Sequence, residues 1–178
     1  MKDENSVFNY IDELISHVTD NTDERMATID EACGDGKMLS YEVFDGIELC
    51  FIDMKISGIY KEVEVEYAEN KIEINYCVTG QYQCEFDDHT MTFIKDLDFS
   101  IHSMDKVVTN YSFNDNYYKG ISIVIDVRKA DPVLAAFLDN EEIRVKDLHT
   151  FLREKTKPIV MKDTVLEQIF TQLYQKKK

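Results

Sequence analysis

The sixteen residues Lys71–Phe86 alternate apolar and polar side chains around a single glycine, Gly80. Such alternation is the mark of strands that turn one face toward a core. If residues 78–80 form a three-residue loop with the glycine left-handed, three pairs of side chains meet on the apolar face: Tyr76 with Tyr82, Ile74 with Cys84 and Ile72 with Phe86. The segment therefore predicts a β-hairpin whose apolar face lines the inside of a sandwich or barrel.

Strand-like runs continue on both sides of this hairpin. Asp45-Gly46, the strongest short hairpin signal, separates the runs Met38–Phe44 and Ile47–Met54. Shorter runs follow a similar pattern: Val63–Tyr67, Met91–Ile94, Phe99–Ser103, Val107–Phe113 and Gly120–Val127. Roughly eight or nine short strands at this spacing predict an antiparallel sandwich or barrel.

Helical patterns stand at the two ends of the chain. Ser6 is expected to cap an N-terminal helix with one apolar side: Val7, Ile11, Leu14, Ile15 and Val18. Asp131-Pro132 predicts a helix start after the last strand. A second helix carries Val145, Leu148, Phe151 and Leu152, and a last one begins at Asp163 or Thr164.

We therefore expect a mainly β protein with helices (α+β) in three parts. Residues 1–37 form an N-terminal helix and an acidic lead-in, residues 38–128 the β-barrel, and residues 129–178 a helical arm. A strand-rich module with a trailing helical arm is more often a sensor with its linker than an enzyme, by analogy alone.

The charge balance limits the partners of the chain. Lys and Arg number 20 and Asp and Glu 35, a formal net charge of −15. A surface this acidic repels phosphate backbones, so the chain by itself is expected to bind nucleic acid poorly. The first residues carry acidic side chains where a signal peptide needs an apolar run, and no segment approaches a membrane span. We expect a cytoplasmic protein with no membrane partner.

Motifs for catalysis and for cofactors are not found in the sequence. Metal-binding barrels of the cupin kind carry an HxH pair, whereas His89 is followed by Thr90 and Met91, so we expect a solvated turn rather than a metal site. His102 is expected to lie within a strand. The four cysteines form no CxxC pair and are expected to be buried thiols. We predict no catalytic residues, no metal and no cofactor.

Aromatic residues are the candidates for ligand binding, because ten Tyr and ten Phe are many for this length. An inward tyrosine offers an apolar ring and a hydroxyl donor, which suits a small-molecule pocket, although the same rings could simply fill the core. The predicted pocket residues are four on the hairpin and two neighbours: Tyr76, Tyr82, Cys84, Phe86, Tyr41 and Phe93.

The last helix has an apolar strip that a small β body need not cover completely. A homodimer interface and packing against its own domain are both open at this stage. The residues predicted for a dimer interface are Leu166, Ile169, Phe170 and Leu173.

Three stretches carry a family resemblance: Ile74–Gln83, Phe113–Ile123 and Leu166–Tyr174. Together, and in this order, they resemble the N-terminal regulatory domain of AraC-family transcriptional regulators, in a branch common in Firmicutes. The resemblance implies a cupin-like β-barrel that binds an unknown small-molecule effector and passes its state through trailing helices to a DNA-binding domain. It also implies a homodimer.

The sequence departs from the family pattern at a few positions. Gln81 stands where the family usually has arginine, Asn114 where it has proline, and residues 95–98 replace a Pro-Gly-Asp turn. In the family, one more helix and two helix-turn-helix motifs follow the last stretch, and the sequence stops before them. We expect DNA contact only through that missing domain, in a chain that is either a fragment or a standalone sensor.

Three other functions stay open. A small cupin-type enzyme, an isomerase or a lyase, would need titratable groups that converge inside the barrel, such as His102 with Glu42 or Glu48. A standalone small-molecule-binding module needs only the pocket. A protein-interaction module would hold a basic partner on the acidic face, and its binding would weaken steeply with salt.

Overall fold

The computed structural model describes residues 15–21, 24–56, 59–61, 69–106, 108–138 and 144–176. Within these residues lie ten strands and three helices. The strands are β1 (Ile15–Asp20), β2 (Arg25–Ile29), β3 (Gly34–Phe44), β4 (Ile47–Ile56), β5 (Ile59–Lys61), β6 (Lys71–Phe86), β7 (Met91–Ile94), β8 (Phe99–Ser103), β9 (Val108–Asp126) and β10 (Ile159–Met161). The helices are α1 (Val127–Leu138), α2 (Val145–Arg153) and α3 (Thr164–Gln175).

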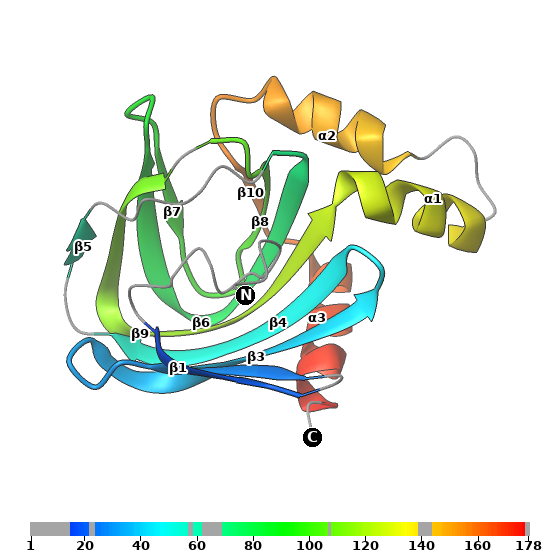
Figure 1. Cartoon of the computed structure of the whole chain (residues 1–178). Helices are drawn as coiled ribbons and strands as arrows, with labels where there is room; N and C mark the ends of the chain where they lie inside the picture. Colours follow the sequence, from blue (N-terminus) through cyan, green and yellow to red (C-terminus); the bar gives the residue numbers. More distant parts are fainter. Residues whose placement is uncertain are drawn as a thin grey trace.

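The strands form one antiparallel sheet that curls into an open barrel (Figure 1). The order of strands is β1-β2-β3-β4-β9-β6-β8-β10, while β5 pairs with β9 and β7 pairs with β6. The long strands β6 and β9 pair along most of their length and lie in the middle of this strand order. The predicted fold class, a mainly β protein with an antiparallel barrel followed by a C-terminal helical arm, is confirmed.

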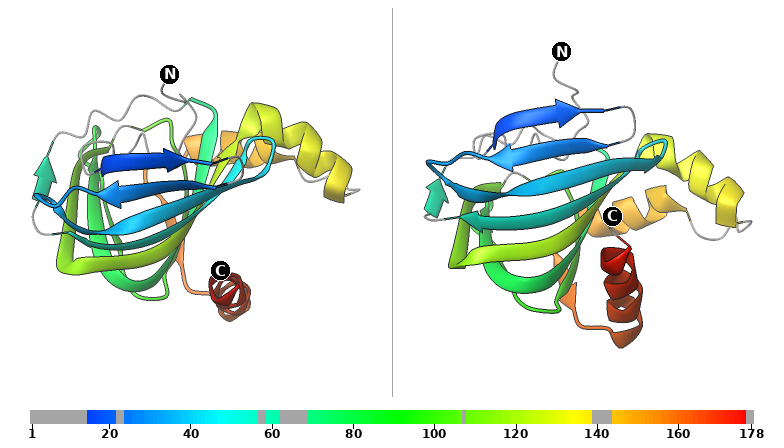
Figure 2. Two further views of the ribbon diagram at one scale, coloured as in Figure 1. Left: turned by 60° about the horizontal axis from the view of Figure 1, so that its bottom comes forward. Right: turned by 90° about the horizontal axis from the view of Figure 1, so that it is seen from below.

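The helices cover the outer, convex face of the sheet. Figure 2 shows α3 lying beneath the sheet, and α1 with α2 at one end of the barrel. Phe170 of α3 packs on a buried outer cluster with Tyr76 and Phe99, while Leu152 of α2 packs on a second cluster with Ile72. Where these helices pack on it, the outer face of the sheet is therefore buried.

The inner face is apolar at depth and polar toward one end. Its deep part holds a buried cluster that includes Met38, Ile52, Met54 and Tyr118. Above it, the register places two polar rows across neighbouring strands. The first row is Ser40, Cys50, Ser122, Asn75 and Ser100, and the second is Glu42, Glu48, Val124, Glu73 and His102.

The hairpin predicted at residues 78–80 is wrong, because β6 is one continuous strand. Gly80 has a positive φ of 101° and lies at an irregularity where the register against β9 shifts. Two such shifts, on either side of residues 79–80, change which side chains face inward. Tyr76 therefore faces outward under α3, whereas Tyr82 packs against the inner cluster.

The sheet begins closer to the N-terminus than predicted. Ile15 and Val18, assigned to a helix from the sequence, belong to β1, which pairs with β2, and β2 pairs with β3. The rest of that predicted helix, and the predicted strand Val63–Tyr67, lie outside the described residues. The predicted Asp45-Gly46 hairpin is confirmed between β3 and β4.

The helical arm differs from the prediction at its start. α1 begins at Val127 rather than at Pro132, because Asp126 caps it by accepting hydrogen bonds from the amides of Arg128 and Lys129. Asp131 instead forms an ion pair with Arg144, just before α2. The predicted start of the last helix is confirmed, with Asp163 as its N-cap. None of the described helices is long and apolar enough to cross a membrane.

Candidate functional site

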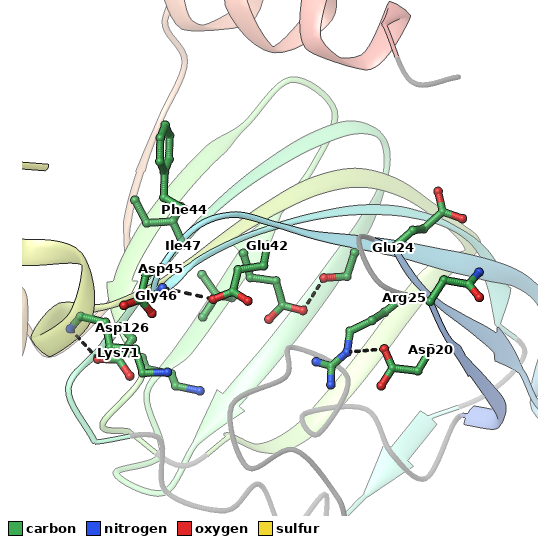
Figure 3. A pocket seen from close by; sticks show the side chains of 15 residues that line it. Asp20, Glu24, Arg25, Glu42, Phe44, Asp45, Gly46, Ile47, Lys71 and Asp126 are labelled. Atoms are coloured by element: carbon green, nitrogen blue, oxygen red, sulfur yellow. Dashed lines mark hydrogen bonds and ion pairs between the residues drawn. The ribbon is translucent and has the colours of Figure 1, made fainter. Parts of the chain in front are cut away.

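A pocket of about 640 Å³, called the mouth pocket below, opens at the polar end of the barrel (Figure 3). It lies where β2, β3, β4 and the facing ends of β6 and β9 come together with α1. Its charged lining consists of six carboxylates, Asp20, Glu24, Glu42, Asp45, Glu48 and Asp126, and three cations, Arg25, Lys71 and Lys129. The pocket is therefore strongly polar and carries an excess of negative charge.

Two glutamates stand directly opposite each other on the wall of this pocket. Glu42 of β3 pairs in register with Glu48 of β4, next to the tight turn that joins the strands. The hydroxyl of Ser40 donates to Glu48, and the amide of Gly46 donates to Glu42 over 3.5 Å. Like charges directly across a strand pair destabilise a sheet. A cationic group bound between the two carboxylates would relieve this repulsion.

Lys71 is the buried cation of the pocket. It is only 6% exposed, at the first position of β6, and it lies opposite Asp126 in the register between β6 and β9. Burying an ammonium group is costly unless carboxylates surround it. Positive and negative groups therefore both face the pocket.

The pocket is in direct contact with the first helix of the arm. Asp126 and Lys129 line the pocket, and Asp126 also caps α1. The amide of Asp126 donates to the carbonyl of Gly46 at 2.8 Å, so the β3–β4 turn is fixed to the start of α1. A Cβ at Gly46 would lie 2.5 Å from Cβ of Lys129, which shows how closely turn and helix approach. A change in the position of Asp126 or of the β3–β4 turn would therefore directly affect the start of α1.

Two of the six predicted ligand residues face outward. Tyr76 is 1% exposed and its ring stacks on Phe99 with centroids 4.4 Å apart. Tyr41 packs against the same outer cluster, and its hydroxyl donates to Glu24 at 2.5 Å. This hydrogen bond raises the pKa of Tyr41 to about 12. The expected inward placement of Tyr76 was wrong, and Tyr41, predicted as a possible neighbour of the pocket, packs on the outer cluster as well.

The other four predicted residues are divided between the interior and the surface. Tyr82, Cys84 and Phe86 pack together with Val108 in a buried cluster, and burial raises the pKa of Cys84 to about 12. Phe93 is 43% exposed on β7. None of the six predicted residues lines the mouth pocket within the described part of the chain.

His102 lies on the inner face but away from the pocket glutamates. Its Nε2 is 3.5 Å from Oε2 of Glu73, the neighbour across β6 and β8. Glu73 also accepts a hydrogen bond from Ser122 at 2.6 Å. Burial lowers the pKa of His102, which favours the neutral ring. Glu42 and Glu48 line the mouth pocket, and His102 does not.

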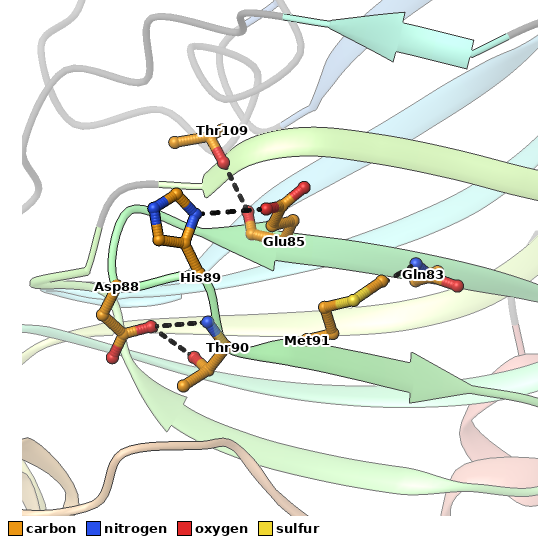
Figure 4. A network of polar contacts seen from close by, with 7 residues as sticks. All are labelled: Gln83, Glu85, Asp88, His89, Thr90, Met91 and Thr109. Carbon is orange, nitrogen blue, oxygen red and sulfur yellow. Dashed lines mark hydrogen bonds and ion pairs between the residues drawn. The ribbon is translucent and has the colours of Figure 1, made fainter.

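The segment Asp87–Thr90 forms the turn that the sequence predicted (Figure 4). Asp88 accepts hydrogen bonds from the amide and the hydroxyl of Thr90, and His89 lies 3.5 Å from Glu85. These contacts close a surface turn. Among the residues that the structure describes, no three His, Cys, Asp or Glu side chains gather as a metal site.

The predicted dimer residues of α3 are mostly used within the chain. Phe170 is buried against the stacked rings of Tyr76 and Phe99, and Leu166 and Leu173 pack beside it. Ile169 is 53% exposed. The apolar strip of α3 thus covers the protein's own sheet, and the homodimer stays a prediction.

The pocket residues were missed because the sequence analysis looked for inward aromatic side chains. Only a partial signal was present. Two glutamates flank the Asp45-Gly46 turn, but a regular two-residue hairpin would pair Glu48 with Val43. The bulge between Glu42 and Phe44 brings Glu42 opposite Glu48. The position of Lys71 and Asp126 carries no comparable local signal, because their approach depends on the pairing of β6 with β9.

No family model matches the sequence, and no curated protein matches it. Among solved structures, an HTH_3 family transcriptional regulator from Vibrio cholerae is similar with a TM-score of 0.36 and 15% identity, over 49% of this chain and 50% of that one. The EutQ protein of Clostridium difficile has a TM-score of 0.36 and 11% identity, over 56% and 75%.

Vicilin from hazelnut, Corylus avellana, has a TM-score of 0.41 and 9% identity, over 83% of this chain and 49% of that one. The matched part of this chain thus spans about half the length of the regulator and of vicilin.

Proposed function

We propose that this domain binds a small polar effector in the mouth pocket and passes its state to the helical arm, as the sensing part of a DNA-binding transcriptional regulator. The observation that carries the proposal is the sharing of residues between pocket and arm. Asp126 lines the pocket and caps α1, and Lys129 lines the pocket from within that helix.

The charges of the pocket define the class of effector. The opposed Glu42 and Glu48 favour a ligand with an ammonium or guanidinium group, since such groups form charge-assisted hydrogen bonds with carboxylates. Ser40 and the cations Arg25 and Lys71 offer partners for hydroxyl or carboxylate groups. An amino sugar, an amino acid or a polyamine has this chemistry.

A ligand can act as a signal only if it binds two states of the protein with different affinity. In this domain the two states would differ in the start of α1. A cationic ligand would compete for the carboxylate of Asp126, whose acceptor atom Oδ1 now holds the amides of Arg128 and Lys129. The strength of this cap, and with it the position of the arm, would then depend on occupancy.

The assignment to a regulator is supported by the resemblance of three stretches to AraC-family regulatory domains. Under this proposal, the helices α1 to α3 form the linker toward a helix-turn-helix domain outside this sequence, and DNA is bound there. The net charge of −15 agrees with a domain that does not itself contact DNA. A cytoplasmic location and a homodimer belong to the same proposal.

In this proposal the domain binds its effector and does not catalyse a reaction. The enzyme hypothesis placed His102 beside Glu42 or Glu48, whereas its Nε2 faces Glu73, 3.5 Å away. Since general acid–base catalysis requires the groups to reach one substrate, we assign no catalytic step to these residues.

The test is a thermal-shift screen of the 178-residue chain, followed by calorimetric titration. The panel is glucosamine, agmatine and lysine, with glucose as the neutral comparison. We expect at least one cationic member to raise the melting temperature while glucose does not. The double variant Glu42→Gln with Glu48→Gln should weaken binding by at least tenfold, because it removes both carboxylates that face the cation.

A matched control carries the same charge change on the surface. Glu31 and Glu154 are exposed, so Glu31→Gln with Glu154→Gln should leave the affinity unchanged. Binding of glucose as tight as that of the cationic compounds, or equal loss in both double variants, would count against the proposal.

A further inference from the structure

A second, smaller cavity lies where the helical arm meets the barrel wall. Its volume is about 170 Å³, and its lining comes from two distant parts of the chain. The barrel contributes Phe86, His102 and Lys106, and the arm contributes Arg153, Lys155 and Lys157. It shares no lining residue with the mouth pocket.

The charge of this cavity is opposite to that of the whole chain. Four of its lining side chains are Lys or Arg, and one, Asp105, is a carboxylate, in a chain of net charge −15. Arg153 is held by Asp105, with Nε and Oδ2 2.7 Å apart. Lys106 donates to Asp88 at 2.5 Å and to the carbonyl of Thr156 at 2.6 Å.

Lys106 brings the arm's lysines to the cavity. Its hydrogen bond to Thr156 fixes the loop after α2 against the turn after β8, and this loop carries Lys155 and Lys157. Neither of these two lysines forms an ion pair with a described residue, although Nζ of Lys155 lies 4.2 Å from the centroid of the Phe151 ring. Lys106 and Arg153, in contrast, pair with Asp88 and Asp105. The helix dipole accounts for Arg153 in the last turn of α2, but not for a lysine from another element.

One buried polar atom beside the cavity also lacks a partner. Nδ1 of His102 is buried and has no hydrogen-bond partner in the described part of the chain. Because Nε2 faces Glu73, a neutral ring that donates there would leave Nδ1 as an acceptor. A ligand with both negative charge and a hydroxyl group would satisfy the cations and this atom together.

We propose that this cavity binds a small oxyanion of the phosphate or carboxylate class. A bound oxyanion would accept hydrogen bonds from Lys155 and Lys157 of the arm and, at the same time, from Lys106 of the barrel. Oxyanions form charge-assisted hydrogen bonds with such ammonium groups. The bound oxyanion would hold the α2–β10 loop against the barrel. The site is independent of the effector pocket, so each proposal can fail without the other.

The test uses the 178-residue chain and two separate probes that each carry a hydroxyl group, inorganic phosphate and the hydroxycarboxylate glycolate. Each is titrated at pH 7.5 and constant ionic strength, with sodium chloride as the reference, while ¹H–¹⁵N spectra are recorded. We expect saturable shifts confined to His102, Lys106 and residues 153–157 with at least one probe. Which probe binds distinguishes a phosphate from a carboxylate ligand.

Two double variants of equal charge change complete the design. Lys155→Gln with Lys157→Gln alters exposed side chains and should weaken binding by at least tenfold in a folded protein. Lys146→Gln with Lys176→Gln, also exposed but outside the cavity, should not. Shifts no larger than with chloride, or equal weakening in both doubles, would overturn the proposal, because the attraction would then be general.

Discussion

Gly80 determines which side chains of β6 face the barrel interior. Its φ of 101° lies in the range that favours glycine, and a Cβ there would come within 2.2 Å of the carbonyl oxygen of Tyr117. The backbone amide of Gly80 is held by Asp96 at 2.6 Å. The irregularity it allows separates the outward Tyr76 from the inward Tyr82. This single residue therefore places two aromatic side chains on opposite faces.

Replacing Gly80 by alanine should destabilise the protein by about 2–3 kcal/mol. The new Cβ would strain a left-handed backbone and meet the fixed backbone of β9. Urea unfolding followed by circular dichroism measures the change. Gln81→Ala, at the neighbouring position, serves as the control and should cost less than about 1 kcal/mol. Equal losses for the two variants would show that the conformation of Gly80 is unimportant.

Local sequence could predict a turn near Gly80 but could not distinguish a loop from a bulge. Both need a glycine with positive φ between alternating residues. The difference lies in β9, whose residues pair with β6 on both sides of the glycine. The wrong choice moved Tyr76 from the outer face to the interior.

At the next scale, α3 is a structural element of the barrel wall. Its buried Phe170 packs against both Tyr76 and Phe99, with ring centroids 5.4 and 5.1 Å away, while Ile169 at the adjacent position stays 53% exposed. The sequence predicted the helix and its apolar strip correctly. It could not tell a dimer interface from packing on the sheet, because both need the same strip.

Phe170→Ala should cost about 3–5 kcal/mol of stability, because it empties a buried aromatic site. Ile169→Ala, on the same helix, should cost less than about 1 kcal/mol in the monomer. Urea unfolding at two protein concentrations measures both. A large cost for Ile169→Ala that grows with protein concentration would instead place Ile169 in a dimer interface.

One carboxylate, Asp131, links α1 to the start of α2. Asp131 accepts from the guanidinium of Arg144 and, at 3.3 Å, from the amide of Lys146. The Arg144 guanidinium lowers the pKa of Asp131 below its ordinary 3.8. A folded-state pKa below the unfolded value means that the contribution is complete above pH 3.8 and is lost as the pH falls through the folded value.

Asp131→Asn should therefore lower stability at pH 7 by about 1.5–3 kcal/mol, the usual range for hydrogen bonds to a charged group. The difference from the wild type should shrink as the pH is lowered below 3.8. Thermal unfolding between pH 7 and pH 2.5 measures it, with the exposed Asp35→Asn as the control. A difference that does not change with pH would contradict the role given to the ion pair.

For the molecule as a whole, the sequence predicted the class of fold and the order of its parts. Alternating residues and the Asp45-Gly46 turn were sufficient for an antiparallel barrel, and Asp163 for the start of α3. The mouth pocket was beyond such patterns. Its wall joins Glu42 and Glu48 to Lys71 and Asp126, and that approach results from strand pairing over long separations along the chain.

The central claim is that the mouth pocket binds a cationic effector and that α1 responds. Hydrogen–deuterium exchange of the 178-residue chain, with and without the tightest compound of the panel, tests it most directly. We predict changed exchange at the β3–β4 turn and in the first turn of α1, and loss of both changes in Glu42→Gln with Glu48→Gln. A compound that binds the pocket but leaves the exchange of α1 unchanged would contradict the account.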